Sequence, residues 1–142
     1  MISENVNFLK VTTSELHLKL LYELLEKRTY NISHSEMPDF ETHKIFVKQN
    51  PYKFWYFIET NKKLVGNFYI KYDNSIGFNL IEYSQIVLAK TIEFIRENFT
   101  PEKECPSTIP PYFYINTPSN NKELHFILQE LDLKSIQISF KV

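Results

Sequence analysis

Apolar side chains recur at two different spacings along the chain. Between residues 53 and 81 they alternate with polar ones in three runs, separated by the turn-forming segments 61–63 and 73–75, which is typical of antiparallel strands. Elsewhere they recur every three to four positions, which is typical of amphipathic helices. The pattern predicts the order β-α-α-β-β-β-α-β-α-β, with strands at 5–11, 53–59, 64–72, 76–81, 112–115 and 135–142 and helices at 12–28, 41–49, 84–99 and 120–131.

Local residues predict how the first helix begins and which face it buries. Thr12 and Glu15 are three residues apart, the spacing of a capping box that would satisfy early backbone donors. Leu16, Leu20 and Leu24 follow at helical spacing, so we expect them to form one buried stripe.

The order of the elements predicts the fold class. Helices before and after an antiparallel meander indicate an α/β fold, with a mixed, mostly antiparallel six-stranded sheet and helices on both of its faces. The four prolines between residues 100 and 111 indicate a surface loop that is too short to link two domains. We therefore expect residues 1–142 to form a single domain.

Composition narrows the possible functions. The 12 Phe and 9 Tyr predict a core and a cleft built from aromatic rings. A formal net charge of −1 gives no basic field, so we expect no nucleic-acid partner. No apolar run has the length of about 20 residues that a membrane span needs, and the N-terminus lacks the apolar region of a signal peptide. With a single cysteine, Cys105, these features favour a cytoplasmic protein with no membrane partner.

Residue counts exclude two kinds of site. The glycines are Gly66 and Gly77 alone, whereas a Walker A loop or a dinucleotide-binding loop needs several glycines close together. One cysteine and four scattered histidines give no zinc-type ligand spacing, so the sequence predicts no metal site.

Residues 28–58 carry four closely spaced motifs. They are Arg28-Thr-Tyr-Asn-Ile-Ser-His34, Met37-Pro38, His43-x-x-Phe46-Val47 and Asn50-Pro51-Tyr52-Lys53-x-Trp55-Tyr56-x-Ile58. This segment resembles a bacterial subfamily of the GCN5-related N-acetyltransferases whose members are associated with the synthesis of surface sugars. A weaker likeness continues through 65–77 and 115–137, so the resemblance covers nearly the whole chain. It implies the fold of that family and an N-acyltransferase that moves an acetyl or similar group from acyl-CoA to the amine of a small molecule, such as an amino sugar.

The resemblance also implies where acetyl-CoA would bind. In this family the pantetheine arm pairs with the backbone of the fourth strand, and the pyrophosphate lies at the N-terminus of the next helix. An asparagine near the start of the last helix holds the arm, although the same residue would equally cap that helix. The residues that the resemblance assigns to the cofactor are Phe78, Asn79, Leu80, Gln85, and Asn120 or Asn121.

The sequence departs from the family pattern at two points. Residues 79–89 contain neither glycine nor arginine, whereas the family has a glycine-containing phosphate loop there. Leu128, or Ile127, stands where many members have a tyrosine that protonates the departing thiolate. We therefore expect acetyl-CoA binding to be weak or lost. The alternative function is a catalytically inactive domain of the same fold that binds a ligand or a partner protein.

Three residues are candidates for catalysis. Glu82 and Tyr83 follow the fourth strand, where the resemblance implies a general base. His34 lies in the loop where such enzymes hold the acceptor. The competing interpretations are a solvated loop position for Glu82 and a structural hydrogen bond for His34.

Aromatic residues are the candidates for binding the acceptor. Trp55 and Tyr56 are adjacent in a strand and face opposite sides, so one belongs to the core and the other could line a cleft. Tyr69 and Tyr72 are further candidates. We expect His34, one of Trp55 and Tyr56, and one of Tyr69 and Tyr72 to border a shared pocket.

Overall fold

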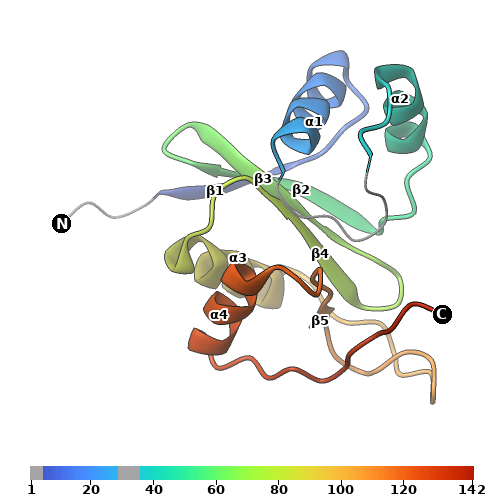
Figure 1. Ribbon diagram of the computed structural model, residues 1–142, viewed down its shortest axis with the longest axis vertical. Helices are drawn as coiled ribbons and strands as arrows, with labels where there is room; N and C mark the ends of the chain where they lie inside the picture. The colour runs from blue at the N-terminus through green and yellow to red at the C-terminus, as the bar shows by residue number, and fades with distance from the viewer. Residues whose placement is uncertain (1–4, 29–35) are drawn as a thin grey trace.

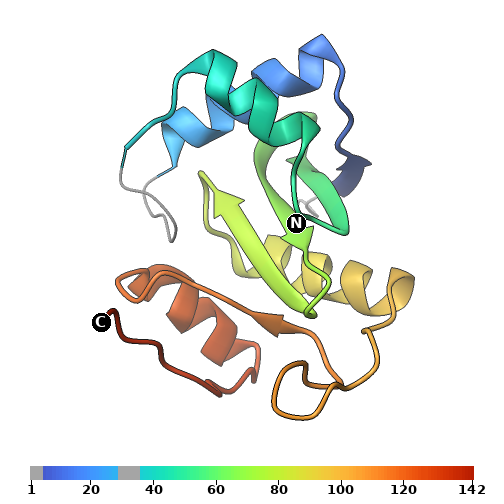
Figure 2. The same ribbon diagram turned by 90° about the vertical axis from the view of Figure 1, so that its right-hand side faces the viewer.

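The computed structural model describes residues 5–28 and 36–142. Within these ranges five strands and four helices form three layers (Figure 1). α1 and α2 cover one face of the sheet, and α3 and α4 cover the other (Figure 2). The elements are β1 (Val6–Lys10), α1 (Glu15–Lys27), α2 (Phe40–Lys48), β2 (Phe54–Thr60), β3 (Lys63–Ile70), β4 (Ser75–Leu80), α3 (Gln85–Asn98), β5 (Tyr114–Ile115) and α4 (Lys122–Glu130).

The strands lie in the sheet in the order of the chain. β1 to β4 are antiparallel neighbours, and β5 joins the other side of β4 in parallel. The predicted pairing of the two strands around the 61–63 turn is confirmed, since Trp55 lies opposite Tyr69. Tyr69 in turn lies opposite Gly77, which places these three residues on one face across three strands.

The predicted sixth strand is wrong among the residues described. Residues 135–142 form no strand, and Ile136, Ile138 and Phe140 are exposed. β5 has two residues and offers too short an edge for a ladder of several hydrogen bonds. The alternation of apolar residues shows which side chains would share a face, but it does not create a partner for the backbone.

The core has two parts, one on each side of the sheet. Trp55 and Phe57 pack with α1 and α2, whereas Ile58 packs with α3 and α4. Rings fill much of the second part, where Phe8 stacks on Phe94 at 4.2 Å and Phe68 meets Phe94 edge-on. The high aromatic content therefore serves the core as much as any cleft.

The start of α1 differs from the prediction. Ser14, rather than Thr12, caps the helix and accepts a hydrogen bond from the His17 N–H at 3.2 Å. The buried stripe is Leu18, Leu21 and Leu24, and Leu16 is 63 % exposed. A run this rich in leucine fits more than one helical phase, so the later start of the helix decides which leucines are buried.

A buried asparagine fixes the proline-containing loop to the sheet. Asn74 lies in the β3–β4 turn with φ 71°. Its Nδ2 donates to the carbonyl oxygens of Glu102 at 3.1 Å and Pro110 at 2.8 Å, and its Oδ1 accepts from the Glu102 N–H at 2.6 Å. An ion pair between Lys53 and Glu102 adds a second link. These contacts hold the loop at 100–111 against the sheet.

Candidate functional site

The backbone of β4 is left open where β5 turns away from it. β5 pairs with β4 at Ser75 and Ile76, and the last cross-strand hydrogen bond runs from the Asn116 N–H to the Ile76 oxygen at 2.9 Å. Beyond this point the two strands diverge, as Figure 2 shows. No strand of the described chain pairs with Phe78 or Leu80 on that side.

The hydrogen-bond phase of β4 determines which groups face this gap. β3 bonds the odd-numbered residues of β4, since the Lys71 N–H donates to the Ser75 oxygen and the Ile81 N–H donates to the Val65 oxygen. The N–H and C=O groups of Phe78 and Leu80 therefore point toward the gap, while those of Asn79 point toward β3. We call this edge, Phe78–Leu80, the β4 opening.

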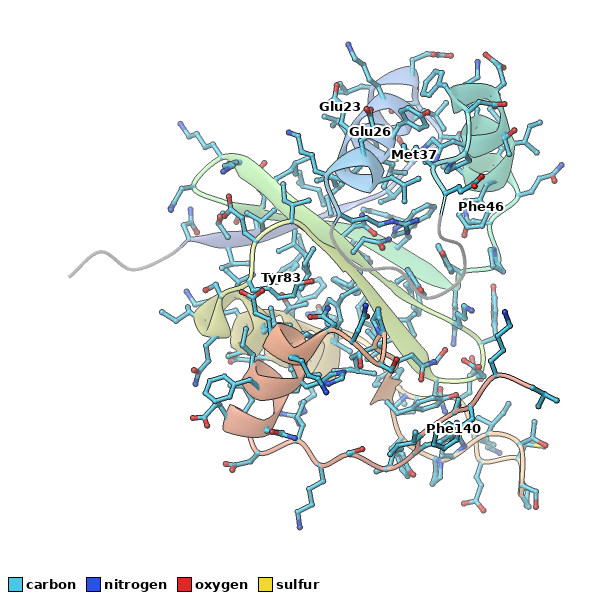
Figure 3. All side chains as sticks on the ribbon, viewed as in Figure 1. Glu23, Glu26, Met37, Phe46, Tyr83 and Phe140 are labelled. Carbon is cyan, nitrogen blue, oxygen red and sulfur yellow. The ribbon has the colours of Figure 1, made fainter. Side chains whose placement is uncertain are left out.

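A hydrogen bond spans the far end of the β4 opening. Asn121 Nδ2 donates to the Tyr83 hydroxyl at 3.0 Å, which links the β4–α3 connection to the start of α4. Asn121 is also the N-cap of α4, because its Oδ1 accepts from the Leu124 N–H at 3.1 Å. Asn120 is exposed one residue earlier. Figure 3 shows Tyr83 beside the start of α3.

α3 begins immediately beyond this bridge. Ser84 is its N-cap and accepts from the Val87 N–H at 3.3 Å. The next two residues, Gln85 and Ile86, have exposed side chains, and the first turn carries no acidic residue. This helix start can receive an anion, but a Cβ is present at every position where glycines would let phosphates approach the backbone closely.

The residues of this edge fit the pantetheine arm of acyl-CoA better than its pyrophosphate. An extended amide-bearing chain needs unpaired backbone groups along a strand, and the β4 opening supplies them at Phe78 and Leu80. The pyrophosphate would meet the α3 N-terminus without a glycine-rich loop. Leu128 packs against the core, as its apolar side chain dictates.

Glu82 and Tyr83 have different surroundings although they are adjacent. Glu82 is exposed and forms an ion pair with Lys63, the first residue of β3. Tyr83 is half-buried and packs against the core beneath α3 and α4. His34 lies outside the described residues. The roles of all three therefore remain predictions.

A polar and aromatic cluster lies between the sheet and the helices α1 and α2. Trp55 Nε1 donates to Asn67 Oδ1 at 3.0 Å, and Asn79 Nδ2 approaches the same oxygen at 3.4 Å. Asn67 is 2 % exposed, and reasoning from the sequence did not select it. A signal was available, because an inward-facing asparagine in a strand needs a buried hydrogen-bond partner.

Two partly buried tyrosines pack against this cluster. The rings of Tyr52 and Tyr69 stack with centroids 3.9 Å apart and an interplanar angle of 6°. Burial, together with the hydrogen bond and electrostatic effect of Tyr69, raises the pKa of Tyr52. Burial likewise raises the pKa of Tyr69. Arg28, at the end of α1, lies close enough to interact electrostatically with both rings, and burial lowers the pKa of its guanidinium group.

The four predicted acceptor-binding rings fall in three places. Trp55 and Tyr69 lie on the face covered by α1 and α2. Tyr56 lies on the opposite face, where its ring stacks on Phe68 at 5.6 Å. Tyr72 is exposed beyond the end of β3, with the Lys53 amine 5.9 Å from its ring centroid.

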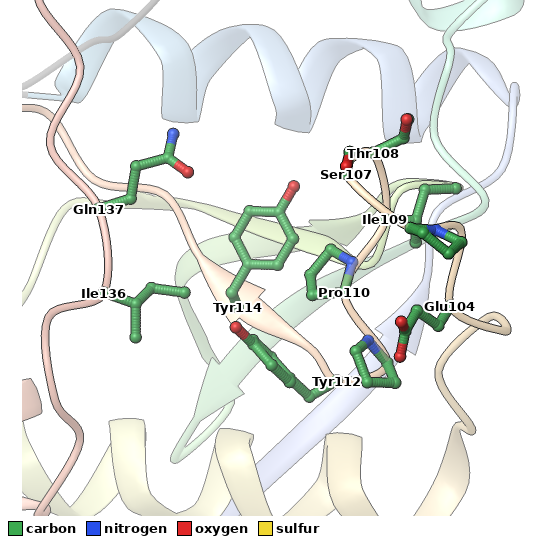
Figure 4. A pocket seen from close by; sticks show the side chains of 11 residues that line it. Glu104, Ser107, Thr108, Ile109, Pro110, Tyr112, Tyr114, Ile136 and Gln137 are labelled. Carbon is green, nitrogen blue, oxygen red and sulfur yellow. The ribbon is translucent and has the colours of Figure 1, made fainter.

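A separate hollow of about 410 Å³ lies beside β5 (Figure 4). Tyr112, Tyr114, the 104–111 loop and the C-terminal residues Ile136 and Gln137 line it. None of the residues that the sequence assigns to catalysis, cofactor or acceptor is among its lining residues. Burial and the nearby Asp73 carboxylate raise the pKa of Tyr114.

No group of three or more His, Cys, Asp or Glu in residues 5–28 and 36–142 could hold a metal ion. No helix within the same residues is long and apolar enough to cross a bilayer.

Comparison with known proteins identifies the fold. No family model matches the chain, and no curated protein matches it in sequence. One solved structure that matches is an aminoglycoside acetyltransferase from an uncultured soil metagenomic sample, in complex with sisomicin. The match has a TM-score of 0.51 at 12 % identity and covers 96 % of this chain and 95 % of that one. The fold is therefore like that of the GCN5-related N-acetyltransferases, with five described strands where six were expected.

Proposed function

We propose that the protein is an N-acyltransferase that moves an acetyl or similar acyl group from acyl-CoA to the amine of a small molecule. The observation that carries this proposal is the β4 opening, where no described strand pairs with the outward backbone groups of Phe78 and Leu80, directly before the N-terminus of α3. A strand edge is exposed to pairing with other chains unless it is covered. A narrow open edge beside a helix N-terminus suits an extended ligand that ends in phosphates. The structural neighbour is itself an acetyltransferase, which agrees with the proposal.

The geometry supports a separate binding role for each part of the candidate site. When bound, acyl-CoA supplies an acyl group activated as a thioester. Phe78 and Leu80 would hold its arm through backbone hydrogen bonds, and their N–H groups can polarise a carbonyl. The start of α3, with Ser84 as N-cap and Gln85 in the first turn, would face the pyrophosphate. Trp55 and Tyr69 would position the acceptor on the α1 and α2 side of the sheet.

Glu82, Tyr83 and His34 are the proposed groups for moving the proton of the amine. The Tyr83 hydroxyl is bonded to Asn121 at the end of the β4 opening, whereas the Glu82 carboxylate is ion-paired with Lys63. The amine nitrogen would attack the thioester carbon, the C–S bond would break, and a base, or a water molecule held by one, would take the proton from the nitrogen. The departing thiolate would take up a proton and leave as free CoA. We further propose a cytoplasmic location.

A second function has a specific observation in its favour. The bond between Asn121 and Tyr83 spans the end of the β4 opening, and α3 begins without glycine. Both features suit a domain that kept the fold, lost the cofactor, and binds a small ligand or a partner protein.

Calorimetric titration with acetyl-CoA separates the two functions. We expect saturable binding that is weaker than that of an enzyme with a glycine-rich loop, on the order of a hundredfold for two or three lost charge-assisted hydrogen bonds. Release of free CoA in the presence of a panel of small amines should follow. Absence of binding at millimolar acetyl-CoA would rule out the acyltransferase and favour the second function.

A further inference from the structure

Arg28 is a half-buried cation without an acidic partner among the residues described. Its side chain lies near the rings of Tyr52 and Tyr69, and it takes part in no ion pair within 5–28 and 36–142. The sequence from 29 to 35 contains neither aspartate nor glutamate. Guanidinium groups keep their charge in proteins, and a charge that is partly removed from water is stabilised by an opposite charge.

The two tyrosines cannot supply that opposite charge. Burial raises the pKa of both phenols, so both rings stay neutral at physiological pH. Neutral phenols do, however, carry O–H groups that can donate hydrogen bonds: the Tyr52 O–H donates to the Tyr69 oxygen, and the Tyr69 O–H can in turn donate to an anion. The close stacking of the rings, at 3.9 Å and 6°, fixes the position of both hydroxyl groups relative to each other.

A second cation approaches the same pair of rings. Lys71 Nζ lies 6.0 Å from the centroid of the Tyr69 ring, within the range of a cation–π contact. The nearby Asp73 carboxylate interacts with Lys71, but Asp73 Oδ1 already accepts hydrogen bonds from the N–H and the hydroxyl of Ser75. The Tyr52–Tyr69 pair is therefore bordered by two positive charges, neither of which forms an ion pair within 4 Å among the described residues.

This arrangement lies beside the β4 opening. The Tyr69 ring rests on Gly77, which immediately precedes Phe78. A group held by Arg28 and the two tyrosines would thus lie over the same strand that carries the β4 opening.

We propose that Arg28 and Lys71, together with the hydroxyl groups of Tyr52 and Tyr69, bind an oxyanion, a carboxylate or a phosphate, on the acceptor molecule. The inference rests on the proposed function, because it names the chemical class of the acceptor at that same site. The acceptor is an amine that carries an oxyanion a short distance from the nitrogen. The planar fork of arginine matches the two oxygens of either group, and such charge-assisted bonds are stronger than neutral ones.

Fluorescence of Trp55 provides a test that does not depend on acyl transfer. Trp55 is the single tryptophan of the chain, and its ring contacts Tyr52 at 4.8 Å. The full-length protein is titrated without acyl-CoA with glucosamine, glucosamine 6-phosphate, glucosaminuronic acid and inorganic phosphate. We expect at least one of the two oxyanion-bearing amino sugars to bind roughly tenfold or more tighter than glucosamine, and the tighter one identifies the group as phosphate or carboxylate. Inorganic phosphate should compete with it.

The two arginines of the chain give a matched pair of variants. R28M should remove the preference for the oxyanion, and R28K, which keeps the charge without the fork, should retain part of it. R96M, at an exposed position in α3, should bind as wild type does. Equal affinity for glucosamine and both oxyanion-bearing sugars, or unchanged binding in R28M and R28K, would overturn the inference. If oxyanion binding persists while acetyl-CoA does not bind, the site stands and the acyltransferase fails.

Discussion

The ring of Tyr69 lies against the backbone of Gly77, the residue opposite it on β4. A Cβ added to Gly77 would fall 2.1 Å from Tyr69 Cζ and 2.2 Å from its hydroxyl oxygen. Gly77 has no positive φ, so its role is to leave space rather than to permit an unusual backbone. One of the two glycines of the chain is thus required by an aromatic side chain that borders the candidate acceptor site.

Replacing Gly77 with alanine should therefore destabilise the protein through Tyr69. The new methyl group must displace the ring and disturb its stack with Tyr52, at a cost of about 1–3 kcal/mol. In the double variant G77A/Y69A the ring is absent, so adding G77A to Y69A should cost little further stability. Urea denaturation of the wild type, both single variants and the double variant gives the coupling energy between the two positions.

Gly66 supplies the control for this cycle. A Cβ there would meet the Asn79 carbonyl oxygen at 2.3 Å, a backbone atom that no side-chain change removes. G66A should be destabilising in the presence and in the absence of the Tyr69 ring. If Y69A rescues both glycine variants equally, the contact between Tyr69 and Gly77 is not the cause.

Asn74 should contribute more to stability than its place in a turn suggests. N74G keeps the positive φ accessible but removes three hydrogen bonds to Glu102 and Pro110, so we expect a loss of about 2–4 kcal/mol. Asn61 also has a positive φ, at 49°, but is exposed, so N61G should change the stability by less than about 0.5 kcal/mol. Equal effects in the two variants, measured by chemical denaturation, would show that the loop is not held by Asn74.

Removing the Tyr83 hydroxyl should ease access to the β4 opening. Y83F breaks the bond with Asn121, so the arm of acyl-CoA would no longer compete with it. We expect acetyl-CoA to bind a few-fold more tightly, with a stability loss of about 0.5–1.5 kcal/mol for the hydrogen bond. Y72F removes a hydroxyl from an exposed ring and should change neither quantity. Weaker binding in Y83F would mean that the hydroxyl contacts the cofactor rather than closing the opening.

Buried His43 predicts a loss of stability in mild acid. Burial lowers the pKa of its ring below the ordinary 6.5, and its Nε2–H donates to the Leu18 carbonyl at 3.3 Å. The unfolded chain therefore takes up the proton first as the pH falls. The stability that the neutral ring provides is complete above pH 6.5 and is lost as the pH falls through 6.5 toward the lower folded-state pKa.

Thermal denaturation between pH 8 and pH 5 tests this dependence. The variant H43Q should be less stable at neutral pH and should show a flatter profile across this range. V47A, in the same helix and equally buried, carries no titratable group and should lose stability by a similar amount at every pH. A wild-type profile that is parallel to that of H43Q would contradict the assignment.

The sequence predicted the local elements of this fold better than which strands pair with one another. The meander between 53 and 81 was predictable because alternation and turn residues act locally. The strand at 135–142 was not, because pairing depends on a partner edge that only the tertiary structure defines. In the candidate site, the family resemblance proposes Phe78 and Leu80 for the cofactor, and the sequence motifs contain Arg28 and Tyr52. The sequence does not show that Arg28 lies near the stacked rings of Tyr52 and Tyr69, because that proximity depends on the tertiary structure.

The order of strands in the sheet has a consequence for how the protein acquires its shape. β1 to β4 are neighbours in both sequence and space, so only short loops must close, apart from the passage through α1 and α2 between β1 and β2. β5 and α4 reach β4 only after α3 and the long loop that Asn74 holds. We expect the meander to fold early and the last third of the chain to dock onto it late. The β4 opening lies between the early-folding meander and the late-docking part of the chain. Its width therefore depends on how β5 and α4 dock onto β4. Substitutions at this boundary can alter ligand access while leaving the early-folding sheet intact.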